Sequence, residues 1–195
     1  TFIKGLIGGM CLDQIVNNYI QPCQMDSGTR RDDNTNGILS SGKNYTDMEH
    51  KWDEAFGYLY GQVDNAKTTD LSTNLSSTGT TLFKYLTKIE GSNDPGIAKR
   101  IFDAFKLGRA AIVAGAYDVR DAQANILKIQ LSKVIGYKSV DYLEGYMSKM
   151  AAGNTADAFH ALSEGYGFIM SLQFTNDGND APYFTKAEVD AMLSK

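Results

Sequence analysis

Apolar residues recur at the spacing of an α-helix along almost the whole of this 195-residue chain. The longest example starts near Asp118, and one face of it carries Val119, Ala122, Ile126 and Ile129. No stretch shows the convincing alternation of β-branched and polar residues that marks a half-buried strand. The sequence therefore predicts a single all-α domain over residues 1–195, built as an antiparallel helical bundle.

Sequence signals at helix ends divide this pattern into seven expected helices. We expect them at residues 2–20, 46–64, 80–90, 95–117, 118–150, 155–174 and from 186 onward. Thr46 with Glu49, and Thr185 with Glu188, have the spacing of a capping box, in which two side chains satisfy the first free amides of a helix. The second and the last helix are therefore expected to start directly after these threonines.

Two further signals concern the longer helices. Asp94 followed by Pro95 is typical of an N-cap and a first helical turn, so the fourth helix is expected to start there. The fifth pattern either runs on to Met150 or breaks at Gly136 with Ser139 as a new cap. We expect a bend at Gly136.

Residues 25–43 form a long polar segment without an apolar period. Such a segment is expected to be a loop that is either mobile or held by a partner. Asp32, Asn34 and Asn36 match the start of a calcium-binding loop, but Lys43 stands where a bidentate Glu belongs. We therefore favour an Asx-rich turn over a calcium site.

Composition excludes some functions and leaves others open. The net charge of −4, without a cluster of Lys or Arg, gives no electrostatic surface for nucleic acid or an anionic membrane. No uninterrupted apolar run approaches the roughly 18 residues of a membrane-spanning helix. Cys11 and Cys23 flank an expected helix end at Pro22, too far apart for the roughly 7 Å that a disulfide allows, so both thiols are expected to be unpaired.

A motif repeats 110 residues apart and contains both histidines of the chain. "HKWDEAFGYL" at residues 50–59 and "HALSEGYGFI" at residues 160–169 share His, Glu at the fourth following position and Gly at the seventh. Chance is a poor explanation, because the chain has only two His and six Glu. The repeat predicts an internal duplication with a pseudo-two-fold axis, with repeat units centred on residues 46–64 and 155–174.

On a helix, each motif places its His, Glu and Gly on one stripe. Two interpretations of this stripe remain open. In the first, His50 with Glu54 and His160 with Glu164 are hydrogen-bonded or ionic pairs in or beside the core. In the second, two such helices face each other, and the four side chains bind one iron, zinc or manganese ion.

Four further residues are expected to support such a site. Gly57 and Gly167 would let another helix approach closely, and Trp52 belongs to the apolar stripe beside the first motif. Arg109 lies among small apolar residues of a mostly buried helix, so we expect it to pair with a bundle carboxylate, for which Glu54 and Glu164 are candidates.

The segments "YTDMEHKWDEAFGYLYG" and "FHALSEGYGFIMSL" resemble a family of bacterial lipoproteins of unknown function that is related to imelysin-like, iron-regulated proteins. The resemblance covers most of the chain. It implies a helical bundle in the periplasm or at the cell surface, a lipid anchor on a preceding segment, and a loose association with iron uptake. Because the sequence does not begin with Met, we also expect the chain to be the C-terminal part of a longer protein.

These observations predict a binding protein rather than an enzyme. There is no HExxH motif for a zinc peptidase and no Gly-x-Ser-x-Gly elbow for a serine hydrolase. We expect a metal ion or a small metal-linked ligand to bind where the two His-x-x-x-Glu helices meet. The alternative is a structural or interaction module that docks other envelope proteins through residues 25–43, with the His and Glu pairs as core contacts.

Overall fold

The structure, a computed structural model, describes residues 2–63, 70–73, 75 and 80–195. All regular elements in these ranges are helical, so the predicted all-α class is confirmed. The N-terminal helix consists of α1 (Phe2–Leu6) and two π-helical segments, η1 (Ile7–Leu12) and η2 (Gln14–Tyr19). The remaining elements are α2 (Pro22–Met25), α3 (Arg30–Thr35), α4 (Asp47–Tyr60), α5 (Thr81–Glu90), α6 (Ile97–Val113), α7 (Tyr117–Ala151), α8 (Thr155–Ser171), the 3-10 turn η3 (Leu172–Phe174) and α9 (Lys186–Leu193).

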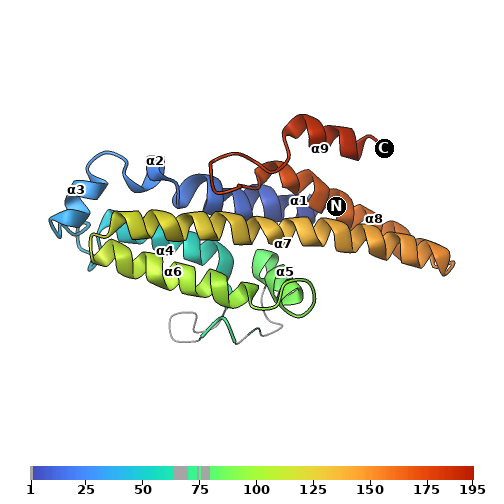
Figure 1. Cartoon of the computed structure of the whole chain (residues 1–195), viewed down its shortest axis with the longest axis horizontal. Coiled ribbons are helices and arrows are strands. Elements are labelled where there is room, and N and C mark those ends of the chain that lie inside the picture. The colour runs from blue at the N-terminus through green and yellow to red at the C-terminus, as the bar shows by residue number, and fades with distance from the viewer. Residues whose placement is uncertain (1, 64–69, 74, 76–79) are drawn as a thin grey trace.

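Helix α7 is the axis of the bundle. It is 35 residues long, and it packs against α6 along its first half and against α8 along its second half (Figure 1). The turns that join α6 to α7 and α7 to α8 are short, and each contains a glycine with positive φ, Gly115 at 68° and Gly153 at 76°. Such turns return the chain antiparallel to itself, which gives the predicted antiparallel bundle.

The N-terminal helix lies along this bundle and contacts both motif helices. Its α1 end packs on α8, and its η2 end packs on α4. The α8 contact is close, because a Cβ added at Gly8 would lie 2.3 Å from the Cβ of Ser171. The Ser171 hydroxyl donates to the carbonyl of Gly167 at 2.8 Å, so it is satisfied within its own helix. Any larger residue at Gly8 would force the two helices apart.

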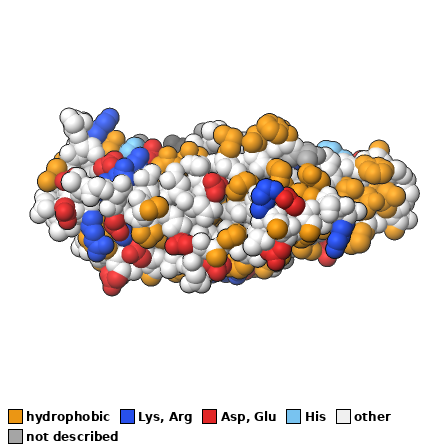
Figure 2. Space-filling model, turned by 90° about the horizontal axis from the view of Figure 1, so that it is seen from above, with side chains coloured by type: hydrophobic (Ala, Val, Ile, Leu, Met, Phe, Trp, Pro, Cys, Tyr) orange, Lys and Arg blue, Asp and Glu red, His pale blue; other side chains and the backbone are white. Residues whose placement is uncertain are grey.

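The surface has a polar part and an apolar part. Figure 2 shows hydrophobic side chains gathered at the end of the molecule that the α7–α8 hairpin forms. Met147, Met150 and Phe159 are exposed there. The charged side chains are more frequent towards the opposite end, where α3 and the start of α4 lie (Figures 1 and 2).

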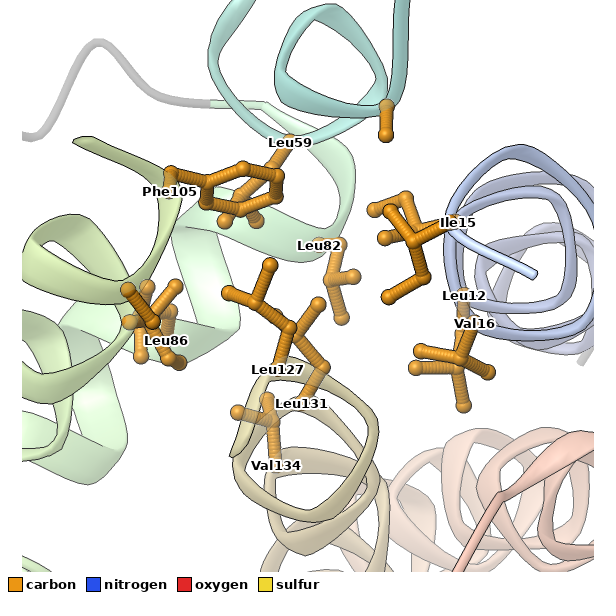
Figure 3. Packing of buried hydrophobic residues seen from close by; sticks show 14 of the residues in the cluster. Leu12, Ile15, Val16, Leu59, Leu82, Leu86, Phe105, Leu127, Leu131 and Val134 are labelled. Carbon is orange, nitrogen blue, oxygen red and sulfur yellow. The ribbon is translucent and has the colours of Figure 1, made fainter. Parts of the chain in front are cut away.

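The core forms where the N-terminal helix, α4, α5, α6 and α7 meet. Figure 3 shows Leu12, Ile15 and Val16 pointing towards Leu127, Leu131 and Val134 of α7, with Leu82 and Leu86 of α5 and Phe105 of α6 beside them. These side chains are at most 1% exposed. Burial of one such side chain stabilises the fold by about 1.5–3 kcal/mol, so this cluster is the main source of stability.

The predicted capping boxes are confirmed at both places. The Thr46 hydroxyl accepts from the amide of Glu49, and Thr185 does the same for Glu188. The prediction for α6 was wrong, because this helix starts at Ile97 rather than at Asp94–Pro95. Its free amides are capped instead by the Glu90 carboxylate, which accepts from Gly96 at 2.7 Å and from Ala98 at 2.8 Å.

Two further expectations were wrong. Helix α7 runs without interruption through Gly136, and the Ser139 hydroxyl donates to the carbonyl of Ile135 at 2.9 Å instead of capping a new helix. Residues 25–43 are not a plain loop, because they contain α3. The guanidinium of the fully buried Arg120 holds this segment through two bonds to Asp26, at 2.7 and 3.0 Å. Charged contacts therefore anchor a segment whose apolar content is low.

The second predicted loop, residues 67–79, lies mostly outside the described residues. The pseudo-two-fold repeat stays a prediction. Helix α4 packs between η2 and α6, whereas α8 packs between α1 and α7. In the described part of the chain, no helix is long and apolar enough to cross a bilayer.

Candidate functional site

The first motif lies on the solvent-facing side of α4. The ring of His50 stacks on Tyr45, with 5.0 Å between ring centroids, and its Nε2 lies 3.6 Å from Oε1 of Glu54. Lys51 also pairs with Glu54, at 2.8 Å. The His50 side chain is 40% exposed. The pair is therefore solvated and is not a buried core pair. A solvated ion pair contributes about 0–1 kcal/mol to stability.

The second motif is divided between solvent and a polar cluster. His160 is 74% exposed, and its Nε2 lies 3.8 Å from Oε1 of Glu164. Glu164 itself pairs with Lys4 of α1 at 3.1 Å. Burial disfavours the Glu164 carboxylate, but the hydrogen bond from Tyr142 and the Lys4 ammonium outweigh it and lower its pKa. The carboxylate therefore fastens the N-terminal helix to α8.

Lys4 has the matching shift. Burial lowers its pKa, but hydrogen bonds to Tyr85 and Glu164 more than compensate, so the pKa is raised above the ordinary value. The Lys4 ammonium also lies 5.1 Å from the centre of the Tyr85 ring. Both members of the pair are thus held in their charged forms, and neither is a free metal ligand.

The two motifs do not meet. The first borders η2 and the second borders α1, at opposite ends of the N-terminal helix. The side chains coloured as histidine lie near opposite ends of the molecule in Figure 2. Among the described residues, no group of three or more His, Cys, Asp or Glu is placed to hold a metal ion. The structure therefore does not assemble His50, Glu54, His160 and Glu164 into one centre.

The supporting residues have separate structural roles. The indole N–H of Trp52 donates to the carbonyl of Phe105 at 2.9 Å, and its ring packs on Gly108 of α6. No described atom lies within 4 Å of a Cβ placed at Gly57, so no helix approaches there. Gly167 is buried and faces α1, as expected for a close helix contact.

Arg109 forms the expected salt bridge with different partners. Its Nη1 lies 2.8 Å from Glu49 and its Nε lies 3.0 Å from Asp53. Both acceptors lie on the face of α4 that packs against α6. Neither Glu54 nor Glu164 contacts this guanidinium, because Glu54 turns to Lys51 and Glu164 to Lys4.

The calcium-loop residues are part of, or directly follow, α3. Asn34 uses its amide to donate to the carbonyl of Ile112 at 2.8 Å, and its oxygen accepts from the Thr46 hydroxyl. The Asn36 amide donates to the backbone carbonyl of Asp32 at 2.8 Å. Asn34 therefore ties α3 to the end of α6 and to the start of α4, and its side-chain oxygen already has a partner.

Buried cations are a feature that the sequence analysis missed. Besides Arg120, the side chains of Lys128 and Lys138 are almost fully buried. Lys128 pairs with Asp180 at 2.7 Å, and Lys138 pairs with Asp141 at 2.7 Å. Helical spacing could have indicated Lys138 with Asp141, three residues apart, but not the long-range pair.

An open groove lies between α7, α8 and α9. Its volume is about 830 Å³. One wall is a stripe of α7 that starts at Lys133 and ends at Leu143, and the opposite wall is a stripe of α8 from Leu162 to Ile169 that continues to Leu172 of η3. The end of α9 closes one side with Met192 and Leu193. Gly136 and Ser139 provide depth because their side chains are absent or small.

Apolar side chains of the groove face water. Val140 is 53% exposed, Tyr166 is 44% exposed, and Phe184 and Met192 are also exposed. Leu162, Tyr166 and Ile169 form an apolar stripe at helical spacing, a pattern that in the sequence alone is typical of a buried helix face. Whether such a stripe is covered depends on which helix packs over it, and α9 covers it only in part, with Val189 as its one buried side chain.

Together these features define an all-α helical bundle with an open apolar groove and separate polar clusters. The chain belongs to a family described as "Domain of unknown function (DUF4856)", which matches residues 1–195. No curated protein and no solved structure matches the chain. The resemblance to imelysin-like proteins therefore stays a prediction.

Proposed function

We propose that the protein is a binding module for an apolar or amphipathic small molecule, which lies in the groove between α7, α8 and α9. The observation that supports this proposal is the groove itself, with a volume of about 830 Å³ and an apolar lining. Ligand sites for small molecules have about 300–1,000 Å³ and are lined mainly by apolar and aromatic side chains. The groove meets both conditions.

Covering the groove is energetically favourable. Val140, Tyr166 and Phe184 expose apolar surface on one continuous stretch, and each methylene of a ligand that leaves water here contributes about 0.8 kcal/mol. Exposed apolar surface with polar residues at its rim is a feature of ligand-binding grooves. The proposal keeps the predicted binding protein and moves its site away from the two histidines.

The metal and iron expectations have less support, because the two His-x-x-x-Glu motifs lie in different surroundings. A periplasmic or surface location and a lipid anchor remain proposals that rest on the family resemblance alone. The alternative of an interaction module differs from the present proposal in one measurable respect, since docking through residues 25–43 does not require that a small apolar molecule binds in the groove.

Gly136 offers a direct test. It lines the groove, and no described atom lies within 4 Å of a Cβ placed there, so Gly136→Phe should fill the groove without disturbing the core. Gly145 lies on the same helix with equally open surroundings but outside the groove lining, which makes Gly145→Phe a matched control.

The measurement is a fluorescence titration with a neutral, polarity-sensitive naphthalene dye. The original protein and Gly145→Phe should bind the dye with equal affinity, and Gly136→Phe should weaken binding by at least about tenfold, or 1.4 kcal/mol. Equal binding by all three proteins would show that the dye binds elsewhere and would overturn the proposal. Absence of binding to the original protein would favour the interaction module.

A further inference from the structure

The charged residues that line the groove all have the same sign. Lys133 and Lys195 are the only charged side chains among the described residues of the lining, and the other lining residues are apolar, aromatic or small. Lys133 lies at the start of the α7 stripe, and Lys195 follows α9. A purely apolar ligand would leave these charges unused, whereas an anionic group would complement them.

Lys133 is the better placed of the two. It belongs to the uninterrupted helix α7, and Tyr137, one turn later, lines the groove beside it. Lys195 is exposed and lies outside a helix, after the end of α9 at Leu193. An ammonium on a rigid helix loses less freedom when it binds an anion than an ammonium outside a helix does.

The neighbours of Lys133 leave its charge available. Its Nζ lies 3.6 Å from Oδ2 of Asp94, which is a long contact. Asp94 is held much more closely by Arg100, with 2.5 Å between Nη2 and Oδ1. Arg100 therefore neutralises most of the Asp94 charge, and the Lys133 ammonium, whose side chain is 41% exposed, can exchange this long ion pair for a closer bond to a ligand anion.

We propose that the ligand is a long apolar chain with one monoanionic head, a carboxylate, that binds Lys133 while the chain lies along the α7 and α8 stripes; this rests on the function proposed above. One lysine matches one negative charge, whereas a doubly charged phosphate monoester is better matched by several cations or a bidentate arginine. From Lys133 to Leu143 the α7 stripe is about 15 Å long, so a saturated chain of about 12 carbons is a suitable probe.

The test compares dodecanoate with dodecanol by isothermal titration calorimetry, using the full chain. The variants are Lys133→Gln and, as a control with the same charge change on the same helix, Lys149→Gln, because Lys149 does not line the groove. We expect the original protein and Lys149→Gln to bind dodecanoate about tenfold more tightly than dodecanol, and Lys133→Gln to lose this preference while it still binds dodecanol.

Three results would contradict the inference. Equal affinity of the original protein for the acid and the alcohol would overturn it and leave the proposed function intact. A preference that survives in Lys133→Gln but disappears in Lys195→Gln would overturn the assignment to Lys133. If neither probe binds, both the inference and the proposed function fail. Binding of dodecanol therefore shows whether the proposed function still holds when the inference about Lys133 fails.

Discussion

Lys4 in α1 and Glu164 in α8 form an ion pair, with 3.1 Å between the ammonium nitrogen and the carboxylate. They are 160 residues apart in the sequence, and their contact connects the start of the chain to its last long helix. The same carboxylate was a candidate metal ligand in the sequence. Its actual partner is a lysine from the N-terminal helix, which gives Glu164 a structural role with a defined dependence on pH.

The first prediction concerns this pH dependence. The pKa of Glu164 lies below its ordinary value of 4.5, so the pair stabilises the fold above that pH and the contribution is lost as the pH falls through the lowered pKa. Glu164→Gln should reduce the free energy of unfolding at pH 7 by about 1 kcal/mol and flatten its fall below pH 4.5.

Urea denaturation at pH 7 and at several acidic pH values measures both effects. Glu144→Gln is the matched control, because this carboxylate is exposed on α7 and its loss should change stability little. If the free energy of unfolding falls equally steeply below pH 4.5 in Glu164→Gln and in the original protein, other carboxylates control this fall.

The second prediction concerns the two histidines. Because His50 and His160 lie in separate clusters, the effects of His50→Ala and His160→Ala on unfolding should add to within about 0.5 kcal/mol in the double variant. Melting temperatures of the four proteins, with and without added zinc, provide the data. A coupling above about 1 kcal/mol, or a zinc-dependent melting temperature that both changes abolish, would restore the shared metal centre.

The third prediction uses two glycines with opposite surroundings. A Cβ at Gly108 would lie 2.1 Å from the Trp52 ring, so Gly108→Ala should destabilise the protein by about 1–3 kcal/mol through overpacking. Gly136→Ala adds a methyl group in open space on a helix and should stabilise it by about 0.5–1 kcal/mol. Chemical denaturation of both variants tests the sign of each effect, and equal effects would contradict the packing described for Trp52.

The fourth prediction compares two tyrosines. The hydroxyl of Tyr60 is buried without a hydrogen-bond partner among the described residues, so Tyr60→Phe should leave stability unchanged or raise it by about 1 kcal/mol. The hydroxyl of Tyr117 lies 2.7 Å from that of Thr35 and 3.1 Å from the Asn34 amide. Tyr117→Phe should therefore cost about 1–2 kcal/mol. Thermal unfolding distinguishes the two, and a large loss for Tyr60→Phe would reveal an unseen partner.

Local signals in the sequence were sufficient for most helices but not for their contacts. Thr46 and Thr185 mark helix starts because a capping box is complete within four residues. The start of α6 was misplaced because its cap, Glu90, comes from the preceding helix. Such a contact depends on how two helices are joined, which no local spacing specifies.

The candidate site could be identified only from the tertiary structure, because local spacing does not specify which helices pack together. Helical spacing correctly placed His50 beside Glu54, and His160 beside Glu164, one turn apart. It could not show that the two helices border different ends of the N-terminal helix. The groove is likewise invisible in the sequence, because a stripe such as that of Tyr166 has the same pattern whether it is covered or open.

Carbon-13 NMR of methyl-labelled methionines, recorded during a titration with dodecanoate, tests the proposed groove site most directly. Of the seven methionines, Met192 lines the groove, whereas Met10 and Met147 are exposed elsewhere. Binding in the groove predicts a progressive shift of the Met192 methyl signal that saturates, is absent in Gly136→Phe, and leaves the Met10 and Met147 signals in place. Saturating binding with an unchanged Met192 signal, or shifts mainly at Met10 or Met147, would contradict the proposed site.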